Sequence, residues 1–137
     1  MLLYRVRGIP DTVAAAVRSS LLSPQYGHPA HAEMATGYGP CRLCLHTFNV
    51  GTEERLLFTY QPFTDPTALP APGPVFIHRA PCDRYDAPGL PEALRPLPLV
   101  EAVLDEVFGH PEARYAHLRN AEAGCFIARV DQCSVCD

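Results

Sequence analysis

Prolines divide this chain into short segments, which limits the length of any helix or strand it can form. The chain has 15 prolines in 137 residues, and many of them lie in two stretches, residues 62–72 and 81–98. Proline has a fixed φ and no backbone N–H, so it is unfavourable inside helices and central strands. Because the prolines are clustered, they indicate loops in a folded domain rather than disorder of the whole chain.

Apolar periodicity between these loops predicts the regular elements. Alternation of apolar and polar residues indicates strands at residues 2–9, 41–48, 55–61, 74–80, 114–120 and 125–131. Asp11 is expected to cap a helix on which Val13, Val17 and Leu21 share one face. A second helix is expected at residues 99–110, ended by Gly109.

The links between these elements predict how the strands pair. Residues 49–53 (NVGTE) and 121–124 (AEAG) are typical of hairpin turns, and residues 23–40 are expected to form a long ordered loop. Hairpin-linked strands with a helix near each end indicate an α+β fold. We expect a single antiparallel sheet of about five or six strands, with two helices packed on one face. The domain should cover residues 1–131, followed by a tail at 132–137.

Charge and hydropathy exclude several classes of partner. Eleven Lys and Arg against fifteen Asp and Glu give a net charge of −4, so nucleic acid is not an expected partner. No apolar run approaches the roughly 18–20 residues of a membrane helix, and arginines interrupt the N-terminal apolar stretch where a signal peptide would have none. A cytoplasmic location with no membrane partner is therefore expected. Reducing conditions there would leave the six cysteines as thiols.

Two Cys-x-x-Cys pairs raise the question of a metal site. Cys41 with Cys44, and Cys133 with Cys136, each have the spacing of half a tetrahedral zinc site. Together they would make the chain a zinc-stabilised interaction module. However, residues three apart on the expected strand 41–48 point to opposite faces. The alternative is that Cys41 and Cys44 are packing residues and that the tail is frayed. Thioredoxin-like redox chemistry is disfavoured, because neither pair lies at a strand-to-helix junction.

A second candidate site is polar and lies on the C-terminal hairpin. Alternation places Cys125 and Arg129 on one strand face and His117 on the same face of the neighbouring strand. The candidate ligand-binding residues are Arg42, His78, His117, Asn120, Cys125 and Arg129. Arginine pairs bidentately with carboxylates and phosphates, so a small anionic metabolite is the expected ligand. Cys125 with His117 is also a nucleophile-and-base combination, which would suit an enzyme. The alternative is a solvated sheet face.

Four stretches of the sequence resemble a known family. They are GYGPCR (residues 37–42), LLFTY (56–60), GPVFIHRA (73–80) and AHLRNAEAGCFIARVD (116–131). In their order and spacing they resemble the bacterial Domain of Unknown Function 1203 family, and the resemblance extends from Tyr4 to Asp131. This chain departs from the family pattern between Arg79 and Leu99, which is short and proline-rich, and in its C-terminal tail. The resemblance implies the limits of the domain and no activity.

Overall fold

The computed structural model describes residues 4–36, 40–61, 73–94, 100–109, 115–119 and 126–132. Their elements are, in chain order, β1 (Tyr4–Arg7), α1 (Asp11–Ser20), β2 (His31–Met34), β3 (Glu54–Tyr60), β4 (Gly73–His78), β5 (Asp86–Pro88), the 3-10 helix η1 (Glu92–Leu94), α2 (Val100–Phe108), β6 (Tyr115–Arg119) and β7 (Phe126–Gln132). The predicted α+β class with two α-helices and antiparallel strand pairing is confirmed for these residues.

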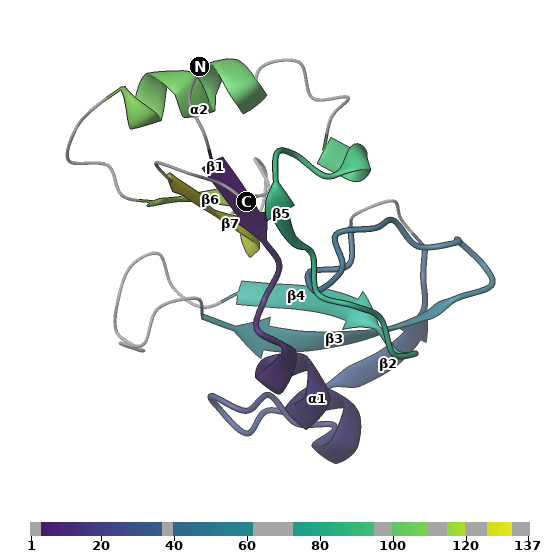
Figure 1. Cartoon of the computed structure of the whole chain (residues 1–137). Coiled ribbons are helices and arrows are strands. Elements are labelled where there is room, and N and C mark those ends of the chain that lie inside the picture. The colour runs from purple at the N-terminus through teal and green to yellow at the C-terminus, as the bar shows by residue number, and fades with distance from the viewer. Residues whose placement is uncertain are drawn as a thin grey trace.

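The strands form two sheets, so the predicted single sheet is wrong. One sheet has four strands in the order β5-β1-β7-β6, and the other has three in the order β2-β3-β4 (Figure 1). Each sheet has its own helix. Ala14 and Val17 of α1 pack with the core of the three-stranded sheet, whereas Leu104 and Phe108 of α2 pack with that of the four-stranded sheet. The helices therefore cover two sheets instead of sharing one face.

The segment 41–48 explains why the sheets separate, because it is a turn and not the expected strand. The backbone N–H of Leu45 donates to the carbonyl of Cys41 at 2.8 Å, and Leu45 has a φ of 60°. Leu43 is buried in the core of the three-stranded sheet, and Leu45 in the core of the four-stranded one. Apolar side chains that alternate between two cores give the same sequence pattern as a strand, which is why periodicity misidentified this segment.

The hairpin expected between residues 41–48 and 55–61 is also absent. β3 pairs instead with β2 and β4. Residues 49–53 do form a turn, in which the N–H of Thr52 donates to the carbonyl of Asn49 at 3.1 Å. This turn does not connect two paired strands, because it links the segment 41–48 to β3. β2 lies within the predicted loop 23–40. The β2 sequence His-Ala-Glu-Met does alternate polar and apolar residues, but it is only four residues long, lies in a segment rich in Gly and Pro and is fully exposed, so the pattern did not predict a strand.

Both helices form where the sequence predicts them, with differences at the caps. Pro10 occupies the N-cap position of α1 without a side-chain hydrogen bond, so Asp11 is the first helical residue and not the cap. Leu21 adopts a left-handed conformation that ends the helix, and it is exposed instead of sharing the apolar face. Gly109 directly follows α2, where the sequence predicts the helix to end, and its N–H donates to the carbonyls of Asp105 and Glu106. Its φ is not positive, so Gly109 does not adopt the left-handed conformation of a glycine cap.

The C-terminal strand pair matches the prediction except at the start of β7. β6 and β7 are antiparallel, and His117 is directly opposite Arg129. Ala128 and Val130 are buried in the core of the four-stranded sheet, while Arg129 is exposed on the other face. A register shift between Leu118 and Arg119 places Phe126 opposite Arg119, so Phe126 packs in the core of the three-stranded sheet and against His117, and not with Ala128 and Val130 as predicted. The expected turn at residues 121–124 lies outside the described residues. β7 also pairs with β1, which places it in the middle of the four-stranded sheet.

Gly8 marks the point where β1 passes closest to the 41–45 turn. A Cβ atom at Gly8 would lie 2.1 Å from the carbonyl oxygen of Leu43, so only glycine fits. Directly after it, the N–H of Ile9 donates to the carbonyl of Arg42 at 2.8 Å. The chain thus crosses from one sheet to the other against the turn that carries Cys41 and Cys44.

Candidate metal centre

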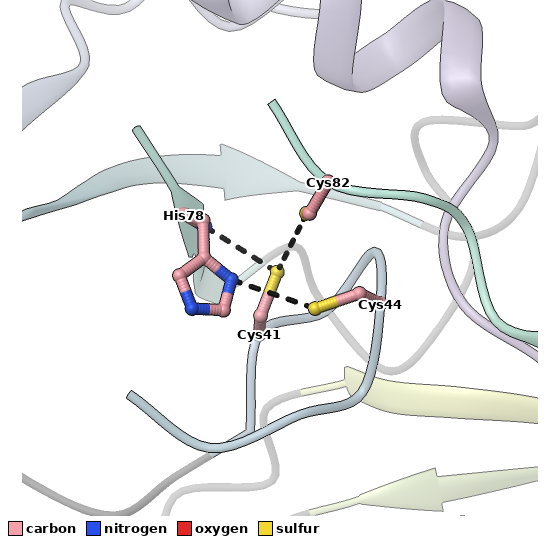
Figure 2. A group of neighbouring side chains, drawn as sticks. All are labelled: Cys41, Cys44, His78 and Cys82. Atoms are coloured by element: carbon pink, nitrogen blue, oxygen red, sulfur yellow. Dashed lines mark hydrogen bonds between the residues drawn. The ribbon is translucent and has the colours of Figure 1, made fainter. Parts of the chain in front are cut away.

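Four side chains from three separate segments gather beside the 41–45 turn. Cys41 and Cys44 flank the turn, His78 is the last residue of β4, and Cys82 follows four residues later (Figure 2). One potential ligand atom from each, three Sγ atoms and an imidazole nitrogen, lie within 4.8 Å of one another. Cys41, Cys44 and His78 are buried, and Cys82 is partly buried. This is a Cys3His set of the kind that binds a metal ion.

The shortest separations in this group match the edges of a tetrahedral zinc site. Zn–S bonds of about 2.3 Å and Zn–N bonds of about 2.0 Å at tetrahedral angles place sulfurs about 3.8 Å apart and a sulfur about 3.5 Å from nitrogen. The Sγ atoms of Cys41 and Cys82 are 3.8 Å apart, and Sγ of Cys44 is 3.4 Å from Nδ1 of His78. The remaining pairs, within 4.8 Å, would need to close by about 1 Å or less.

Groups around the four residues are arranged to stabilise negative charge on sulfur. The backbone N–H of His78 donates to Sγ of Cys41 at 3.3 Å. From α1, Nη2 of Arg18 donates to Sγ of Cys82 at 3.3 Å and also to the carbonyls of His78 and Ala80. A guanidinium and a backbone N–H aimed at sulfur favour the thiolate over the thiol, which is the form that binds metal.

The imidazole of His78 is also oriented by a carboxylate. Its Nδ1 faces Cys44, while its Nε2 lies 3.3 Å from a carboxylate oxygen of Glu53. A histidine that binds metal through one nitrogen commonly donates its other N–H to a carboxylate, which fixes the ring and its tautomer. Phe48 packs against the ring at a centroid distance of 4.3 Å. The ring is therefore positioned with Nδ1 toward the sulfurs.

The acid–base properties of the group follow from these hydrogen bonds. Hydrogen bonds from Cys44 and Cys82 lower the pKa of Cys41 well below its usual value, and the bond to Cys41 raises the pKa of the Cys44 thiol. The bond to Cys41 likewise raises the pKa of His78 to about 10. A metal ion that binds here must displace the shared protons, so its affinity should rise with pH.

The structure brings together one half of the cysteine set predicted from sequence. Cys41 and Cys44 are adjacent, because the turn places both thiols on one side, whereas Cys133 and Cys136 lie outside the described residues. Sequence reasoning missed Cys82, which falls in a segment interpreted only as a proline-rich loop. The sequence does contain a pattern that indicates these ligands, because Cys41-x-x-Cys44 followed by His78-x-x-x-Cys82 has the spacings of a zinc ligand set.

The residues predicted to bind an anion are distributed over several places. His117 and Arg129 are cross-strand neighbours, whereas His78 belongs to the metal group. Arg42 is buried and donates to the carbonyls of Phe126 at 2.7 Å and Pro40 at 2.6 Å, which is a structural role. Asn120 and Cys125, including the suggested pairing of Cys125 with His117, lie outside the described residues.

Comparison with known proteins supports the family resemblance over part of the chain. The family model described as Protein of unknown function (DUF1203) matches residues 38–100, a little under half of the sequence. This confirms the resemblance for that stretch, which contains all four candidate metal ligands. The match does not extend to the C-terminal motif at 116–131 or to Tyr4. No curated protein and no solved structure matches the chain.

Among the described residues, no helix combines the length and apolar character needed to cross a membrane.

Proposed function

We propose that this protein is a zinc-binding domain in which Cys41, Cys44, His78 and Cys82 hold one structural zinc ion. The observation that carries the proposal is the convergence of three sulfurs and one imidazole nitrogen within 4.8 Å. Sulfur and imidazole ligands in tetrahedral arrangement favour zinc among the divalent metals. Iron is the other metal that tetrahedral thiolate sites take, so a test must measure both.

The burial and the number of ligands support a structural metal instead of a catalytic one. A catalytic zinc has three protein ligands and keeps one position open for water or substrate, whereas a structural zinc has four protein ligands. This set already provides four. Cys41 is fully buried and Cys44 is 5 % exposed, so water has little access from the side of the turn. The proposed zinc therefore stabilises the fold and does no chemistry.

The charges around the set also suit a zinc ion. Three thiolates and a neutral imidazole around Zn²⁺ carry a net charge of −1, and burying an uncompensated charge is costly. Arg18 supplies the opposite charge at Cys82. The metal would join three segments that no sheet connects directly: the 41–45 turn, the end of β4 and the loop that leads to β5. Arg18 would link α1 to the same centre.

Metal analysis of the purified protein tests the proposal. We expect about one zinc and no iron per chain, release of the zinc by a strong chelator, and a large fall in melting temperature on its removal, because a metal bound only by the folded state stabilises that state. Substitution with Co²⁺ should give the intense visible absorption of tetrahedral cobalt with sulfur ligands. Re-addition of zinc should restore the melting temperature.

The same experiment separates the metal from a redox role for these thiols. The Sγ atoms of Cys41 and Cys82 are neighbours, so a chain that did not bind metal could form a disulfide there under oxidising conditions. A metal-free protein as isolated, with a melting temperature that zinc does not change, would contradict the proposal. Protection of the thiols from alkylation and oxidation in the presence of zinc would support it.

A further inference from the structure

A second site lies between the two sheets and includes none of the four candidate metal ligands. It is a cavity of about 380 Å³, a size typical of small-molecule sites. Arg7 and Arg129 line it from the four-stranded sheet, Tyr60 lines it from the end of β3, and Arg84 lines it from the segment before β5. His117 also lines it. Three arginines thus converge on one cavity in a chain whose net charge is −4.

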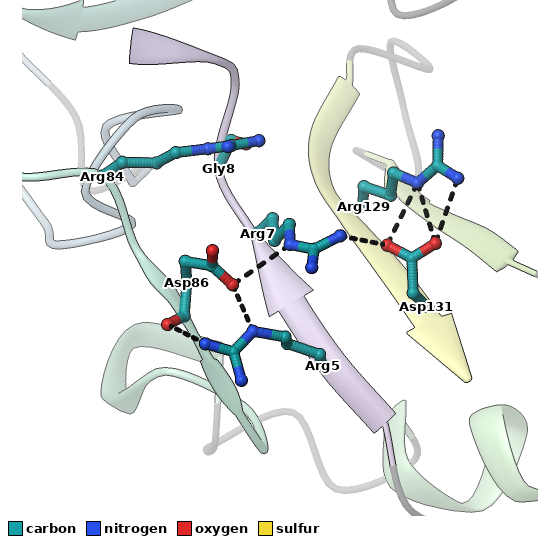
Figure 3. Close-up of polar contacts among 7 residues, drawn as sticks. All are labelled: Arg5, Arg7, Gly8, Arg84, Asp86, Arg129 and Asp131. Carbon is teal, nitrogen blue, oxygen red and sulfur yellow. Dashed lines mark hydrogen bonds and ion pairs between the residues drawn. The ribbon is translucent and has the colours of Figure 1, made fainter. Parts of the chain in front are cut away.

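Each of these arginines is held in place by acceptors from the protein. Arg7 lies between two carboxylates, with Nε 3.1 Å from Asp86 and Nη1 3.2 Å from Asp131 (Figure 3). Arg129 uses Nε and Nη2 on Asp131. Arg84 uses Nε and Nη2 on the carbonyl of Gly8. Arginines oriented in this way lose little side-chain entropy when they bind a ligand.

Each of these arginines keeps one terminal nitrogen for a ligand. In the part of the chain that the structure describes, Nη2 of Arg7 and Nη1 of both Arg84 and Arg129 have no acceptor from the protein. The side chains of Arg7 and Arg129 are 37 % and 45 % exposed, so solvent and ligands can reach them. Guanidinium N–H groups are strong donors to phosphate and carboxylate oxygens.

The local charge balance is positive even with the internal ion pairs counted. The lining residues Arg7, Arg84 and Arg129 are cations, and Asp86 is a carboxylate in the same lining. With Arg5, which pairs with Asp86, and Asp131, which pairs with Arg7 and Arg129, the group keeps two positive charges. The walls between them are partly apolar, because the rings of Tyr60 and Phe126 pack at a centroid distance of 5.6 Å. Low-dielectric walls strengthen the attraction of such a site for an anion.

We propose that this cavity binds a small metabolite through an oxyanion group, either a phosphate or a pair of carboxylates, with Arg84 and Arg129 as the ligand-binding arginines. Tyr60 and His117 contribute further polar groups to the wall. Arg129 belongs to β7 of the four-stranded sheet and Tyr60 to β3 of the other sheet, so the ligand would contact both sheets. This site is independent of the proposed zinc centre.

Calorimetric titration at constant ionic strength tests the inference. The titrants are inorganic phosphate and succinate, and the relative affinities show which oxyanion chemistry the cavity prefers. We expect saturable one-site binding of at least one titrant. Arg129→Met should weaken it by roughly 10- to 100-fold, the effect of losing hydrogen bonds from a charged donor. Arg129→Lys, which keeps the charge and loses the planar fork, should weaken it less.

Arg79→Met is the matched control, because Arg79 is exposed, pairs only with Glu54 among the described residues and does not line the cavity. NMR spectra recorded during the titration should show shifts of the Arg84 side chain and of Tyr60, a readout that requires no variant. The inference would be overturned if neither phosphate nor succinate bound saturably, or if Arg79→Met and Arg129→Met lost affinity equally.

The zinc content of the same samples keeps the two proposals apart. A protein that holds zinc and binds neither anion would contradict this inference alone. A protein without metal that binds phosphate through Arg129 would contradict only the proposed structural zinc.

Discussion

His78 lies between two partners, with its Nδ1 3.4 Å from Sγ of Cys44 and its Nε2 3.3 Å from a carboxylate oxygen of Glu53. This relationship identifies which ring nitrogen faces the proposed metal and which is oriented from outside. Because loss of such an outer partner commonly weakens metal binding by about 10- to 100-fold, Glu53 gives the first prediction.

Glu53→Gln should lower the zinc affinity by about 10-fold or more while leaving one zinc bound at saturation. Competition with a chromophoric chelator measures the affinity. Glu54→Gln is the control, because Glu54 pairs with the exposed Arg79 and does not touch His78. An equal effect of the two substitutions would show that Glu53 contributes only general negative charge.

Substitution of cysteines should separate the proposed ligands from the tail. Cys82→Ser removes one of the four ligands, so we expect the protein to lose its zinc and a large part of its stability. In Cys133→Ser with Cys136→Ser, zinc content and melting temperature should stay at the wild-type values. Zinc lost from the tail variant and kept in Cys82→Ser would assign the metal to the Cys-x-x-Cys pairs instead.

Arg18→Met should destabilise the zinc-loaded protein by about 1–3 kcal/mol, because Arg18 donates to the carbonyls of His78 and Ala80 and to the sulfur of Cys82. The effect should be smaller in the metal-free protein, where Cys82 need not be a thiolate. Denaturant unfolding with and without zinc measures both values. Arg79→Met should change the free energy of unfolding by about 0–1 kcal/mol, as expected for an exposed ion pair.

The pH dependence of stability should contain a contribution from His117. Burial, followed by the charges of Arg119 and Arg129, lowers the pKa of His117 from 6.5 to about 4, with Asp131 acting in the opposite direction. The unfolded chain therefore binds a proton near pH 6.5 that the folded protein binds only near pH 4. This contribution to stability is present above pH 6.5 and is lost as the pH falls toward 4.

Comparison of wild type with His117→Gln isolates this contribution from acid release of zinc, which affects both proteins. Between pH 7 and pH 5 the wild type should lose about 2 kcal/mol more stability than the variant. The measurement is denaturant unfolding at several pH values. Parallel pH profiles would mean that His117 titrates normally in the folded protein.

Gly8→Ala should destabilise the protein by about 3 kcal/mol or prevent folding, because the added Cβ would lie 2.1 Å from the carbonyl oxygen of Leu43. Gly73→Ala is the matched control, since its Cβ would meet nothing within 4 Å. Its effect should be small by comparison. Thermal unfolding of both variants measures the difference, and similar melting temperatures would show that the crossing beside the 41–45 turn relaxes easily.

Local sequence patterns determined the elements whose stability comes from neighbouring residues. The helix of Asp11–Ser20, the end of α2 before Gly109 and the burial of Ala128 and Val130 with Arg129 on the opposite face all follow from short-range patterns, and the structure has them. β2 was not predicted in this way, because its alternating pattern is only four residues long and the strand is held by pairing with β3 and by the ion pair of Glu33 with Arg55.

The candidate metal centre could be predicted only in part from local sequence patterns. Cys-x-x-Cys at 41–44 indicated metal from the sequence alone, but the expected strand would have separated the two thiols. Tertiary burial of Leu43 and Leu45 in two different cores makes this segment a turn, and the turn places both thiols together. Apolar periodicity in a sequence indicates which side chains are buried, but it does not indicate which of two cores each side chain enters.

The α+β class, the family resemblance and half of the candidate ligand set could be predicted from the sequence. The division of the described strands into two sheets, the completion of the ligand set by His78 and Cys82, and the cavity lined by Arg7, Arg84 and Arg129 depend on tertiary contacts. The physical reason is the same in each case. Residues distant in sequence are brought together by strand pairing and by burial of shared apolar surface, and these interactions leave no fixed spacing along the chain.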